Sequence, residues 1–556
     1  LGFNLWKLCL YVPPESFFDA ADEAGLPVWL EMPLWLPQVT PALKALALRE
    51  YAAVLRRLHH HPCLALLSLG CELNAQADAE FLRALHDLAR AWLPNTLLCD
   101  NSGSAEAYGG VEAALSDFYD YHFYTDPHFF APLAQHFRRA HRPDKPWIYG
   151  EFCDADTLRD FGRVAEAWWL RDPVPLDREE HTWQREHARR LSVAGVTDGG
   201  AALADLGRRQ ATALRQFILE SVRREHATGG YVVTGWADTP ITTSGVVDDA
   251  GALKFEPDAW RRFNADIVLS LDRERRRRWQ GGDRPNPKDP FVWWQDEAVE
   301  LHLVVSNGSA GPLAGQPAWT LADAGGATVA AGQLPAIQAA AGAVQEVGRI
   351  TWRWPAASDL RTYTLSAAIG AIHNHWQIWA VPRPAWPREL ALAGPLLHRP
   401  PLGVFGRATA FSPLEAAGPA TVALAEALTP EVLAHLGAGG RVLLWQTQPD
   451  QRFTHPLPFW REAIHVFEPD RLWDRVGGAL QPIWRRFDAR QMTWADYVVV
   501  GQMGAASPRG RRRRRGRLLA TSLRLAGGLG AQPVGLETNP LGAWLLAALL
   551  ERLADG

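Results

Sequence analysis

The sequence contains little cysteine and no long apolar run. Its 556 residues include five cysteines, Cys9, Cys63, Cys71, Cys99 and Cys153, all in the first third, and no pair has the C-x-x-C spacing of a zinc or redox site. A disulfide scaffold is therefore excluded, and we expect reduced thiols. No apolar stretch reaches the roughly 18–20 residues of a transmembrane helix, which argues against a membrane partner. No signal peptide is visible, which favours a cytoplasmic location.

Lysine is also scarce, because only five of the 57 basic residues are lysine. With abundant glycine, proline and alanine, this arginine bias indicates a GC-rich genome rather than a function. The formal net charge of −4 gives no global attraction for nucleic acid. The arginine runs Arg275–Arg278 and Arg511–Arg515 lack interleaved aromatic residues, so we interpret them as a solvated linker and a solvated loop. We therefore expect no nucleic-acid partner.

Tryptophan, by contrast, is abundant, with 25 residues. Flat aromatic rings stack on the C–H faces of pyranoses, so sugar binding is one common reason for such an excess. Hydrophobic residues make up 47% of the chain and charged residues 21%, which is ordinary globular composition. The length predicts two to four domains.

The first 265 residues or so alternate short apolar runs with amphipathic stretches, which predicts a parallel sheet with helical crossovers. Seven strands are expected, at Phe3–Cys9, Pro27–Glu31, Leu64–Glu72, Thr96–Asp100, Phe118–Tyr124, Trp147–Glu151 and Gly230–Trp236. Most end in a polar residue, which is typical of the mouth of a (β/α)8 barrel. Such a barrel needs eight strands. Because the chain starts directly in an apolar segment at Leu1, we expect the first strand to lie upstream of it.

The whole chain is predicted to be a multidomain α/β and β protein. We assign residues 1–268 to the barrel and residues 269–290, rich in arginine, glycine and proline, to a linker. Alternating apolar and polar residues predict an antiparallel β-sandwich over 291–383. Buried strands and helices such as Pro430–Leu436 and Leu541–Leu553 predict a small Rossmann-like α/β domain over 384–556.

Two glutamates stand out in the predicted barrel. Glu72 and Glu151 each follow a glycine-containing apolar run at the end of a strand, and these are the fourth and seventh strands of the expected barrel. Those strands face each other across the mouth, so both carboxylates reach one small volume. A pair about 5 Å apart is what a retaining glycosidase requires. The alternative is that each glutamate is a structural ion-pair partner.

A set of ordered motifs makes the interpretation more specific. The sequence contains Gly2-Phe3-Asn4, a stretch from Asp22 to Pro33 reading DEAGLPVWLEMP, and His61-Pro62 followed by Ser68-Leu69-Gly70-Cys71-Glu72. This order resembles the catalytic barrel of glycoside hydrolase family 2, which contains β-galactosidases, β-glucuronidases and β-mannosidases. The resemblance covers residues 1 to about 265. It implies that Glu72 is the acid/base and Glu151 the nucleophile.

Other residues at the mouth are candidates for substrate binding. By the resemblance, Tyr124 hydrogen-bonds the nucleophile and His122 a sugar hydroxyl; the alternative is a packed Tyr and a satisfied buried His. Trp236 is a candidate stacking platform, or a core tryptophan. Asn101 either reaches the substrate or caps a turn. Glu31 either binds substrate or holds a neighbouring charge.

Two residues depart from the family pattern. The family usually has Asn directly before the acid/base, where it hydrogen-bonds the sugar 2-hydroxyl, but Cys71 stands there and a thiol is a weak donor. The family often has Arg-x-Ser-His-Tyr on the second strand, and Leu10 replaces the His. Either the substrate differs or activity is weak.

The C-terminal domain resembles the glutamine-amidotransferase-like domains attached to some of these hydrolases. No cysteine follows residue 153, so we expect no amidotransferase activity. No cofactor is expected, and no metal site at the adjacent histidines 59–61, which would point different ways on a helix.

We therefore expect a retaining, exo-acting β-glycoside hydrolase of β-galactosidase-like type that acts on a carbohydrate substrate; a homo-oligomer stays open. The alternative is a catalytically weak or inactive carbohydrate-binding or assembly protein derived from such an enzyme.

Overall fold

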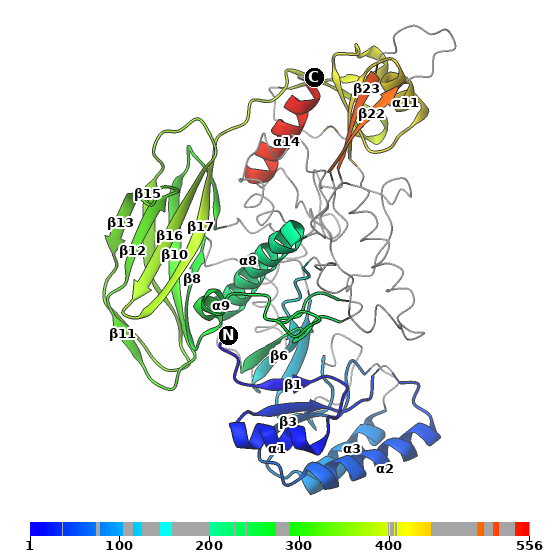
Figure 1. Cartoon of the computed structure of the whole chain (residues 1–556), viewed down its shortest axis with the longest axis vertical. Helices are drawn as coiled ribbons and strands as arrows, with labels where there is room; N and C mark the ends of the chain where they lie inside the picture. Colours follow the sequence, from blue (N-terminus) through cyan, green and yellow to red (C-terminus); the bar gives the residue numbers. More distant parts are fainter. Residues whose placement is uncertain are drawn as a thin grey trace.

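The computed structural model describes residues 1–35, 37–73, 78–103, 115–124, 145–157, 201–225, 229–239, 242–273, 290–398, 400, 405, 409–445, 498–504, 515–521 and 540–554. The chain is a mixed α/β and β protein of several parts spread along one long axis (Figure 1). Parallel strands with helices form one end, a β-sandwich flanks the middle, and an α/β sheet forms the other end. None of the described helices is long and apolar enough to cross a membrane.

The strands expected in the first 265 residues are confirmed. They are β1 (Trp6–Leu8), β2 (Val28–Glu31), β3 (Leu64–Ser68), β4 (Leu97–Cys99), β5 (Tyr119–Phe123), β6 (Trp147–Phe152) and β7 (Gly230–Val233). They form two parallel sheets, in the orders β1-β2-β3-β4 and β5-β6-β7. A backbone hydrogen bond of 2.8 Å from Asp117 to Leu98 links the neighbouring edges. Among the described residues no ladder closes these sheets on each other, so the eight-stranded barrel stays a prediction.

Five described helices accompany these strands. They are α1 (Glu15–Ala24), α2 (Pro41–Leu58), α3 (Ala79–Trp92), α8 (Ala201–Glu225) and α9 (Pro257–Asn264). The side chains of Thr40 and Asp78 accept backbone N–H groups at the starts of α2 and α3, which is why these helices begin there. Buried residues such as Phe18 and Leu85 pack these helices on the sheet.

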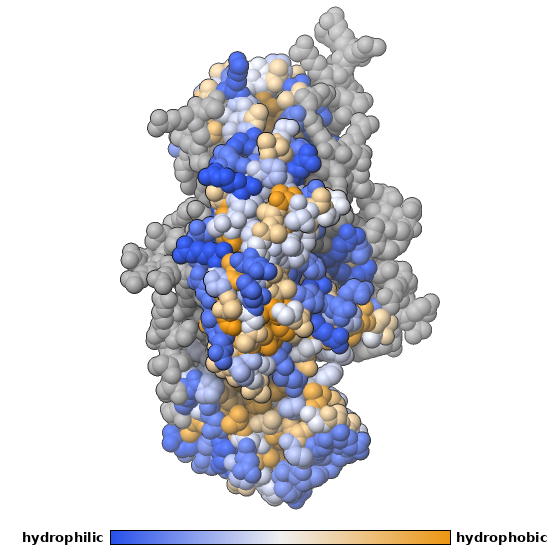
Figure 2. All heavy atoms as spheres, turned by 90° about the vertical axis from the view of Figure 1, so that its left-hand side faces the viewer, coloured by the Kyte–Doolittle hydropathy of each residue, from blue (hydrophilic) through white to orange (hydrophobic). Residues whose placement is uncertain are grey.

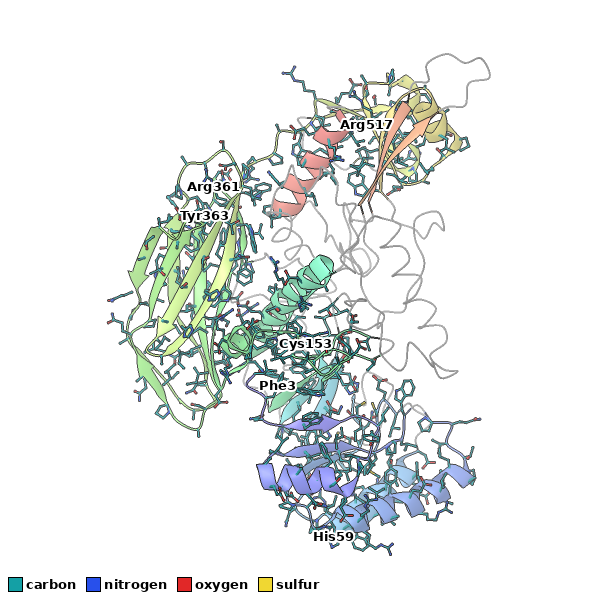
Figure 3. The ribbon with its side chains drawn as sticks, viewed as in Figure 1. Phe3, His59, Cys153, Arg361, Tyr363 and Arg517 are labelled. Atoms are coloured by element: carbon teal, nitrogen blue, oxygen red, sulfur yellow. The ribbon has the colours of Figure 1, made fainter. Side chains whose placement is uncertain are left out.

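Helix α8 packs behind β6, at the point where that strand ends. The buried guanidinium of Arg215 donates to the carbonyl oxygens of Cys153 and Ser244. Figure 3 shows Cys153 between the parallel strands and α8. The loops that follow β6 and β7 are therefore tied to one rigid helix.

The sandwich begins earlier in the chain than expected, with strand β8 (Ile267–Asp272). Its strands are β8 (Ile267–Asp272), β9 (Val292–Trp294), β10 (Ala298–Asn307), β11 (Leu313–Gly315), β12 (Ala318–Asp323), β13 (Thr328–Gln333), β14 (Ile337–Ala339), β15 (Val344–Arg353), β16 (Arg361–Ile369) and β17 (Ile372–Val381). They form sheets of order β15-β10-β8, β13-β12-β16-β17-β9 and β11-β14. We expected a barrel up to residue 268 and a linker from 269. Instead β8 pairs with β10, because its apolar residues Val268, Leu269 and Leu271 are buried there.

The last part is an α/β sheet of order β19-β18-β20-β21-β23-β22. Its elements are β18 (Glu389–Leu392), η4 (Gly394–Leu397), β19 (Ala410–Pro413), η5 (Leu414–Ala416), β20 (Val422–Ala425), α11 (Pro430–Gly437), β21 (Arg441–Trp445), β22 (Val498–Gly504), β23 (Arg515–Thr521) and α14 (Pro540–Ala554). All its pairings are parallel except β22 with β23. The two predicted helices are confirmed, and α14 joins its core to the sandwich core. The amidotransferase resemblance stays a prediction.

Much of the tryptophan excess belongs to the cores. Among the described residues nine tryptophans are buried, at positions 29, 147, 260, 293, 319, 352, 376, 379 and 445. Five of them lie in the strands or loops of the sandwich. On the sandwich side of the molecule, hydrophilic residues interrupt the hydrophobic ones (Figure 2). These nine tryptophans pack in the protein interior. Only exposed tryptophan rings can therefore stack on a sugar.

A buried carboxyl group joins α8 to the sandwich and predicts a pH-dependent stability. Glu220 is fully buried and accepts hydrogen bonds from Gln216, Asn374 and Trp376 at 2.8–3.0 Å. Burial raises its pKa to about 7, from 4.5. The folded state therefore keeps a proton that the unfolded state releases. We expect the free energy of unfolding to fall as pH rises from about 4.5 to 7, by as much as about 3 kcal/mol.

The matched variant is Glu220→Gln, which cannot titrate. Chemical denaturation across pH 4 to 8 should show wild type losing stability relative to this variant inside that window, with a constant difference outside it. A difference that is constant throughout, or that runs in the opposite direction, would contradict this assignment.

Candidate active site

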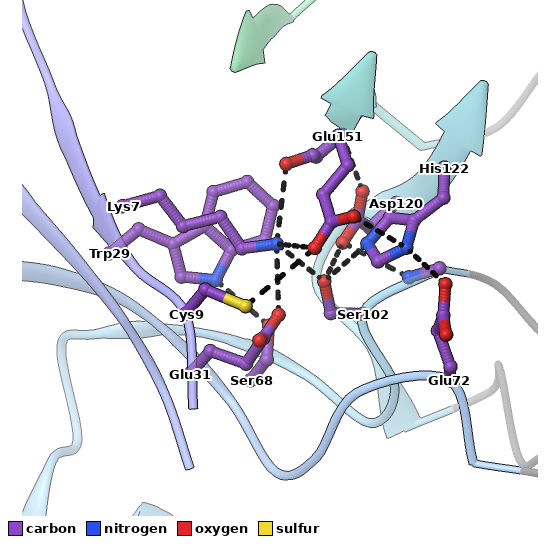
Figure 4. A network of polar contacts seen from close by, with 12 residues as sticks. Lys7, Cys9, Trp29, Glu31, Ser68, Glu72, Ser102, Asp120, His122 and Glu151 are labelled. Atoms are coloured by element: carbon purple, nitrogen blue, oxygen red, sulfur yellow. Dashed lines mark hydrogen bonds and ion pairs between the residues drawn. The ribbon is translucent and has the colours of Figure 1, made fainter. Parts of the chain in front are cut away.

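The C-terminal ends of β1, β3, β5 and β6 place a set of polar side chains around one small volume. Figure 4 shows Lys7, Glu72, His122 and Glu151 converging there from four different strands or the turns that follow them. β1 and β3 belong to one parallel sheet, and β5 and β6 to the other. Side chains distant in sequence meet where the ends of these strands come together.

Glu72 lies four residues beyond β3, in a turn that is fixed by its neighbours. The backbone N–H of Cys71 donates to Leu34 at 2.9 Å, and that of Glu72 donates to Ser102 at 2.7 Å. Glu72 has a φ of +47°, a conformation that costs a non-glycine residue about 1–3 kcal/mol. The side-chain oxygen of Asn101 accepts the N–H of Leu73 at 2.9 Å. The turn therefore holds the Glu72 carboxylate in one place.

Glu151 extends from β6 itself, and the residue before it has to be glycine. A Cβ atom on Gly150 would lie 2.1 Å from a carboxylate oxygen of Asp120. That same oxygen accepts the N–H of Gly150 at 2.7 Å. The hydroxyl of Tyr124 donates to Glu151 Oε2 at 2.9 Å. Burial and the charge of Glu151 raise the pKa of Tyr124, so its hydroxyl keeps its proton and donates.

His122 lies between the two glutamates. Its Nδ1 is 3.0 Å from Glu72 Oε1 and 3.4 Å from Glu151 Oε2, and its Nε2 is 3.0 Å from Ser102 Oγ. Burial lowers the pKa of His122, but the hydrogen bond with Glu72 and the charge of Glu151 outweigh it and hold the pKa above its ordinary value. The imidazole thus bridges both carboxylates from a buried position.

Lys7 supplies the positive charge beneath the site. Its ammonium is 2.8 Å from a Glu31 oxygen, 2.8 Å from Ser102 Oγ and 3.9 Å from Glu151 Oε1. Burial lowers the pKa of Lys7, but Glu31, Asp120 and Glu151 outweigh it, so the pKa is raised. The side chains of Lys7 and Glu31 are 2% and 0% exposed. Glu31 therefore holds a neighbouring charge, the second of the two roles that the sequence left open.

Two thiols reach the same volume. Cys9 is exposed, and its Sγ is 3.8 Å from Glu151 Oε1. Cys71 is buried, and a hydrogen bond with Cys9 together with burial raises its pKa, which keeps it a neutral thiol. Donor atoms of Glu31, Cys71, His122 and Glu151 lie within 4.8 Å of one another, a set that zinc accepts. The ammonium group of Lys7 already lies beside two of these carboxylates, those of Glu31 and Glu151.

In the described part of the chain, three aromatic side chains at the mouth are exposed. Tyr124 donates its hydrogen bond to Glu151. Trp236 follows β7, which pairs with β6, and its ring rests on Trp6 with ring centroids 4.9 Å apart. Trp35 follows β2, and its indole Nε1 donates to Glu72 Oε2 at 3.0 Å. Trp236 and Trp35 are 49% and 56% exposed, so both rings are open to a ligand.

The structure thus brings together most residues expected from the sequence. Glu72, Glu151, His122, Tyr124 and Cys71 lie in one cluster, and Trp236 is exposed beside it. Asn101 is only 1% exposed, and its oxygen holds the turn at Leu73, so its substrate-binding role stays a prediction. This hydrogen bond matches the turn alternative.

Sequence reasoning missed Lys7, Ser102, Asp120 and Trp35. A signal existed for Lys7, since it is one of five lysines and stands at a strand end where the family motif has arginine. Trp35 gave no signal, because it is one of 25 tryptophans and lies beyond the strand that orients it.

Residues 297–382 match the family described as a domain of unknown function, DUF8488. No curated protein matches this sequence. Similar solved structures include a β-D-mannosidase from Dictyoglomus thermophilum (14% identity, 67% of this chain and 46% of that one, TM-score 0.47) and the exo-chitosanase of Amycolatopsis orientalis (14%, 68% and 45%, 0.44). Another is a β-glucuronidase from Parabacteroides merdae (15%, 70% and 45%, 0.36). The chain spans less than half the length of each of these proteins.

Proposed function

We propose that this protein is a retaining, exo-acting β-glycoside hydrolase in which Glu151 is the nucleophile and Glu72 the acid/base. The observation that carries the proposal is the position of both carboxylates on one imidazole nitrogen, His122 Nδ1. Two carboxyl groups from different strands, both partly open to solvent and supported from beneath by a buried lysine, match the needs of glycoside hydrolysis.

The spacing of the two carboxylates is compatible with retention. Since one nitrogen lies 3.0 Å from Glu72 Oε1 and 3.4 Å from Glu151 Oε2, these two oxygens are no farther apart than the sum of those distances. Retaining enzymes hold their two carboxyl groups about 5–5.5 Å apart, and this upper limit on the nearest oxygens accommodates that spacing. Direct attack by one carboxylate needs such a short spacing.

The reaction then has two steps. Glu151 Oε1 or Oε2 forms a bond to the anomeric carbon, while the bond from that carbon to the leaving oxygen breaks and Glu72 gives its proton to that oxygen. In the second step Glu72 takes a proton from water, whose oxygen attacks the anomeric carbon and displaces Glu151. The hydrogen bond from Tyr124 orients Glu151 for the first attack. His122 faces both carboxylates and balances their charge as the proton moves.

The substrate is a terminal β-linked sugar, with β-galactosides as the first candidates. Cys71 stands where the resembling family reads the 2-hydroxyl, and it is 2% exposed, so this enzyme reads that hydroxyl weakly. We therefore expect lower discrimination at the 2-position than an asparagine provides.

A second function is favoured by one specific observation. His122 is within ion-pair distance of both glutamates and has a raised pKa. A protonated His122 favours the charged form of Glu72, which has to carry a proton to act as an acid. This arrangement, together with Cys71, supports a catalytically weak or inactive carbohydrate-binding protein.

A panel of nitrophenyl β-glycosides distinguishes the two functions. We expect wild type to release nitrophenol from at least one sugar and Glu151→Ala to fall to the background rate on the same sugar. If wild type matches Glu151→Ala on every sugar, while both bind sugars equally well by calorimetry, the hydrolase is excluded and the binding protein stands.

A further inference from the structure

The exposed ring of Trp35 lies beside the carboxylate that we assign as the acid/base. It is 56% exposed, and no aromatic ring among the described residues stacks on it. Its backbone is held by a β-bridge to Cys71, the residue directly before Glu72. The indole N–H is bonded to Glu72 Oε2 at 3.0 Å. The ring is therefore fixed at both its backbone and its nitrogen, while its faces are open.

The two oxygens of Glu72 face opposite partners. Oε1 is bonded to His122, which also faces Glu151, whereas Oε2 is bonded to Trp35. Trp35 thus lies on the side of Glu72 away from the nucleophile. Trp236 lies on the other side, since it follows β7, the neighbour of the strand that carries Glu151. Of the tryptophans that the structure describes, one exposed ring thus flanks the site at each end.

This order assigns a direction to the substrate. The sugar that is cleaved has its anomeric carbon at Glu151, and the leaving oxygen lies at the proton of Glu72. Whatever that oxygen carries extends past Glu72, which is where Trp35 presents its ring. The faces of an indole are electron-rich, and the C–H groups of a pyranose are weakly positive, so a sugar ring stacks on it with favourable dispersion and electrostatics.

We propose that Trp35 is the binding platform for the leaving-group sugar, so that the natural substrates are β-linked di- or oligosaccharides rather than glycosides of small alcohols. This inference rests on the proposed function, because it uses Glu72 as the acid/base. Trp35 positions the leaving sugar under the proton of Glu72 and does not itself take part in bond breaking.

The test compares two substrates of the sugar that the nitrophenyl panel identifies, with β-D-galactose as the first case. The glycosyl fluoride has no second ring, and the β-1,4-linked disaccharide has one. We expect Trp35→Ala to lower kcat/KM at least tenfold more for the disaccharide than for the fluoride. Leu97→Ala removes an exposed apolar side chain at the opposite end of β4 and should leave this ratio unchanged.

Trp35→Phe separates the ring from the hydrogen bond. It keeps a stacking face, so the ratio should stay within about threefold of wild type. It removes the N–H donor that favours the charged form of Glu72, so the alkaline limb of the pH–activity profile should move to higher pH. Thermal unfolding of each variant checks that the exposed position leaves the fold intact.

The outcomes are distinct. If wild type hydrolyses both substrates and Trp35→Ala keeps the wild-type ratio, Trp35 is not the platform. The same conclusion follows if Trp35→Phe lowers the ratio of the disaccharide kcat/KM to the fluoride kcat/KM as much as Trp35→Ala does. If wild type hydrolyses neither the fluoride nor any nitrophenyl glycoside, the proposed function itself fails.

Discussion

Glu72→Ala is expected to lower the hydrolysis of a β-linked disaccharide by about 10²–10⁴-fold. A sugar alkoxide is a poor leaving group and needs the proton that Glu72 carries. Dinitrophenolate needs no proton, so release of the first equivalent of dinitrophenol from a dinitrophenyl β-glycoside should be close to the wild-type rate. Stopped-flow absorbance should then show a burst, because the variant also lacks the base that activates water for the second step.

An added anion gives this prediction a second readout. Azide is small, needs no base, and fits the space left by the Glu72 side chain, so it should attack the intermediate and yield a β-glycosyl azide. The matched control is Glu80→Ala, which removes an exposed carboxylate from the first turn of α3. Equal losses on both substrates, or a Glu72→Ala enzyme with full activity on the disaccharide, would show that Glu72 is not the acid/base.

Lys7→Met should give the largest loss of stability. Lys7 and Glu31 form an ion pair of 2.8 Å with side chains that are 2% and 0% exposed. Removing the cation leaves a buried carboxylate without its counter-ion, a change that costs about 3–5 kcal/mol. Urea denaturation at pH 7 measures this difference. Burial raises the pKa of Glu31, but the charge of Lys7 outweighs burial and lowers this pKa below its ordinary value. The effect of removing Lys7 on stability therefore depends on pH.

The double variant Lys7→Met/Glu31→Gln removes both charges and should recover much of the lost stability. At low pH the single variant should also recover relative to wild type, since Glu31 then takes up a proton. The matched surface pair is Arg349 and Glu300, 3.1 Å apart and both more than half exposed; Arg349→Met should cost less than about 1 kcal/mol. A single variant as stable as wild type, or a double variant that is less stable than the single one, would contradict the role of Lys7 as the buried counter-ion.

Strand positions were predictable because the period of apolar residues is a local property. β6 and the glutamate at its end can be read from Trp147 to Glu151 alone. The boundary at residue 268 was wrong for a non-local reason. Nothing in Ile267–Asp272 indicates which sheet it joins, and its pairing with β10 depends on a strand about 30 residues later.

In the candidate site, too, local features were predictable from the sequence and non-local contacts were not. Glu72 and Glu151 were found from strand ends and an ordered motif, and the contacts of His122 with both carboxylates show that the ends of β3 and β6 meet. Trp35 was not predictable, because its contact with Glu72 depends on the bridge between residues 35 and 71. The two roles left open for Asn101 could not be separated by its position in the sequence, because the hydrogen bond from the N–H of Leu73 to its oxygen depends on a neighbouring turn.

Covalent trapping tests the assignment of Glu151 most directly. An activated 2-deoxy-2-fluoro-β-glycoside slows both steps but carries a good leaving group, so the glycosyl-enzyme accumulates. Intact-mass analysis should show the addition of one fluorosugar per chain, and peptide fragmentation should place it on Glu151, with no addition to Glu151→Ala. Attachment to another residue, or turnover of the nitrophenyl substrate without any trapped adduct, would contradict double displacement through Glu151.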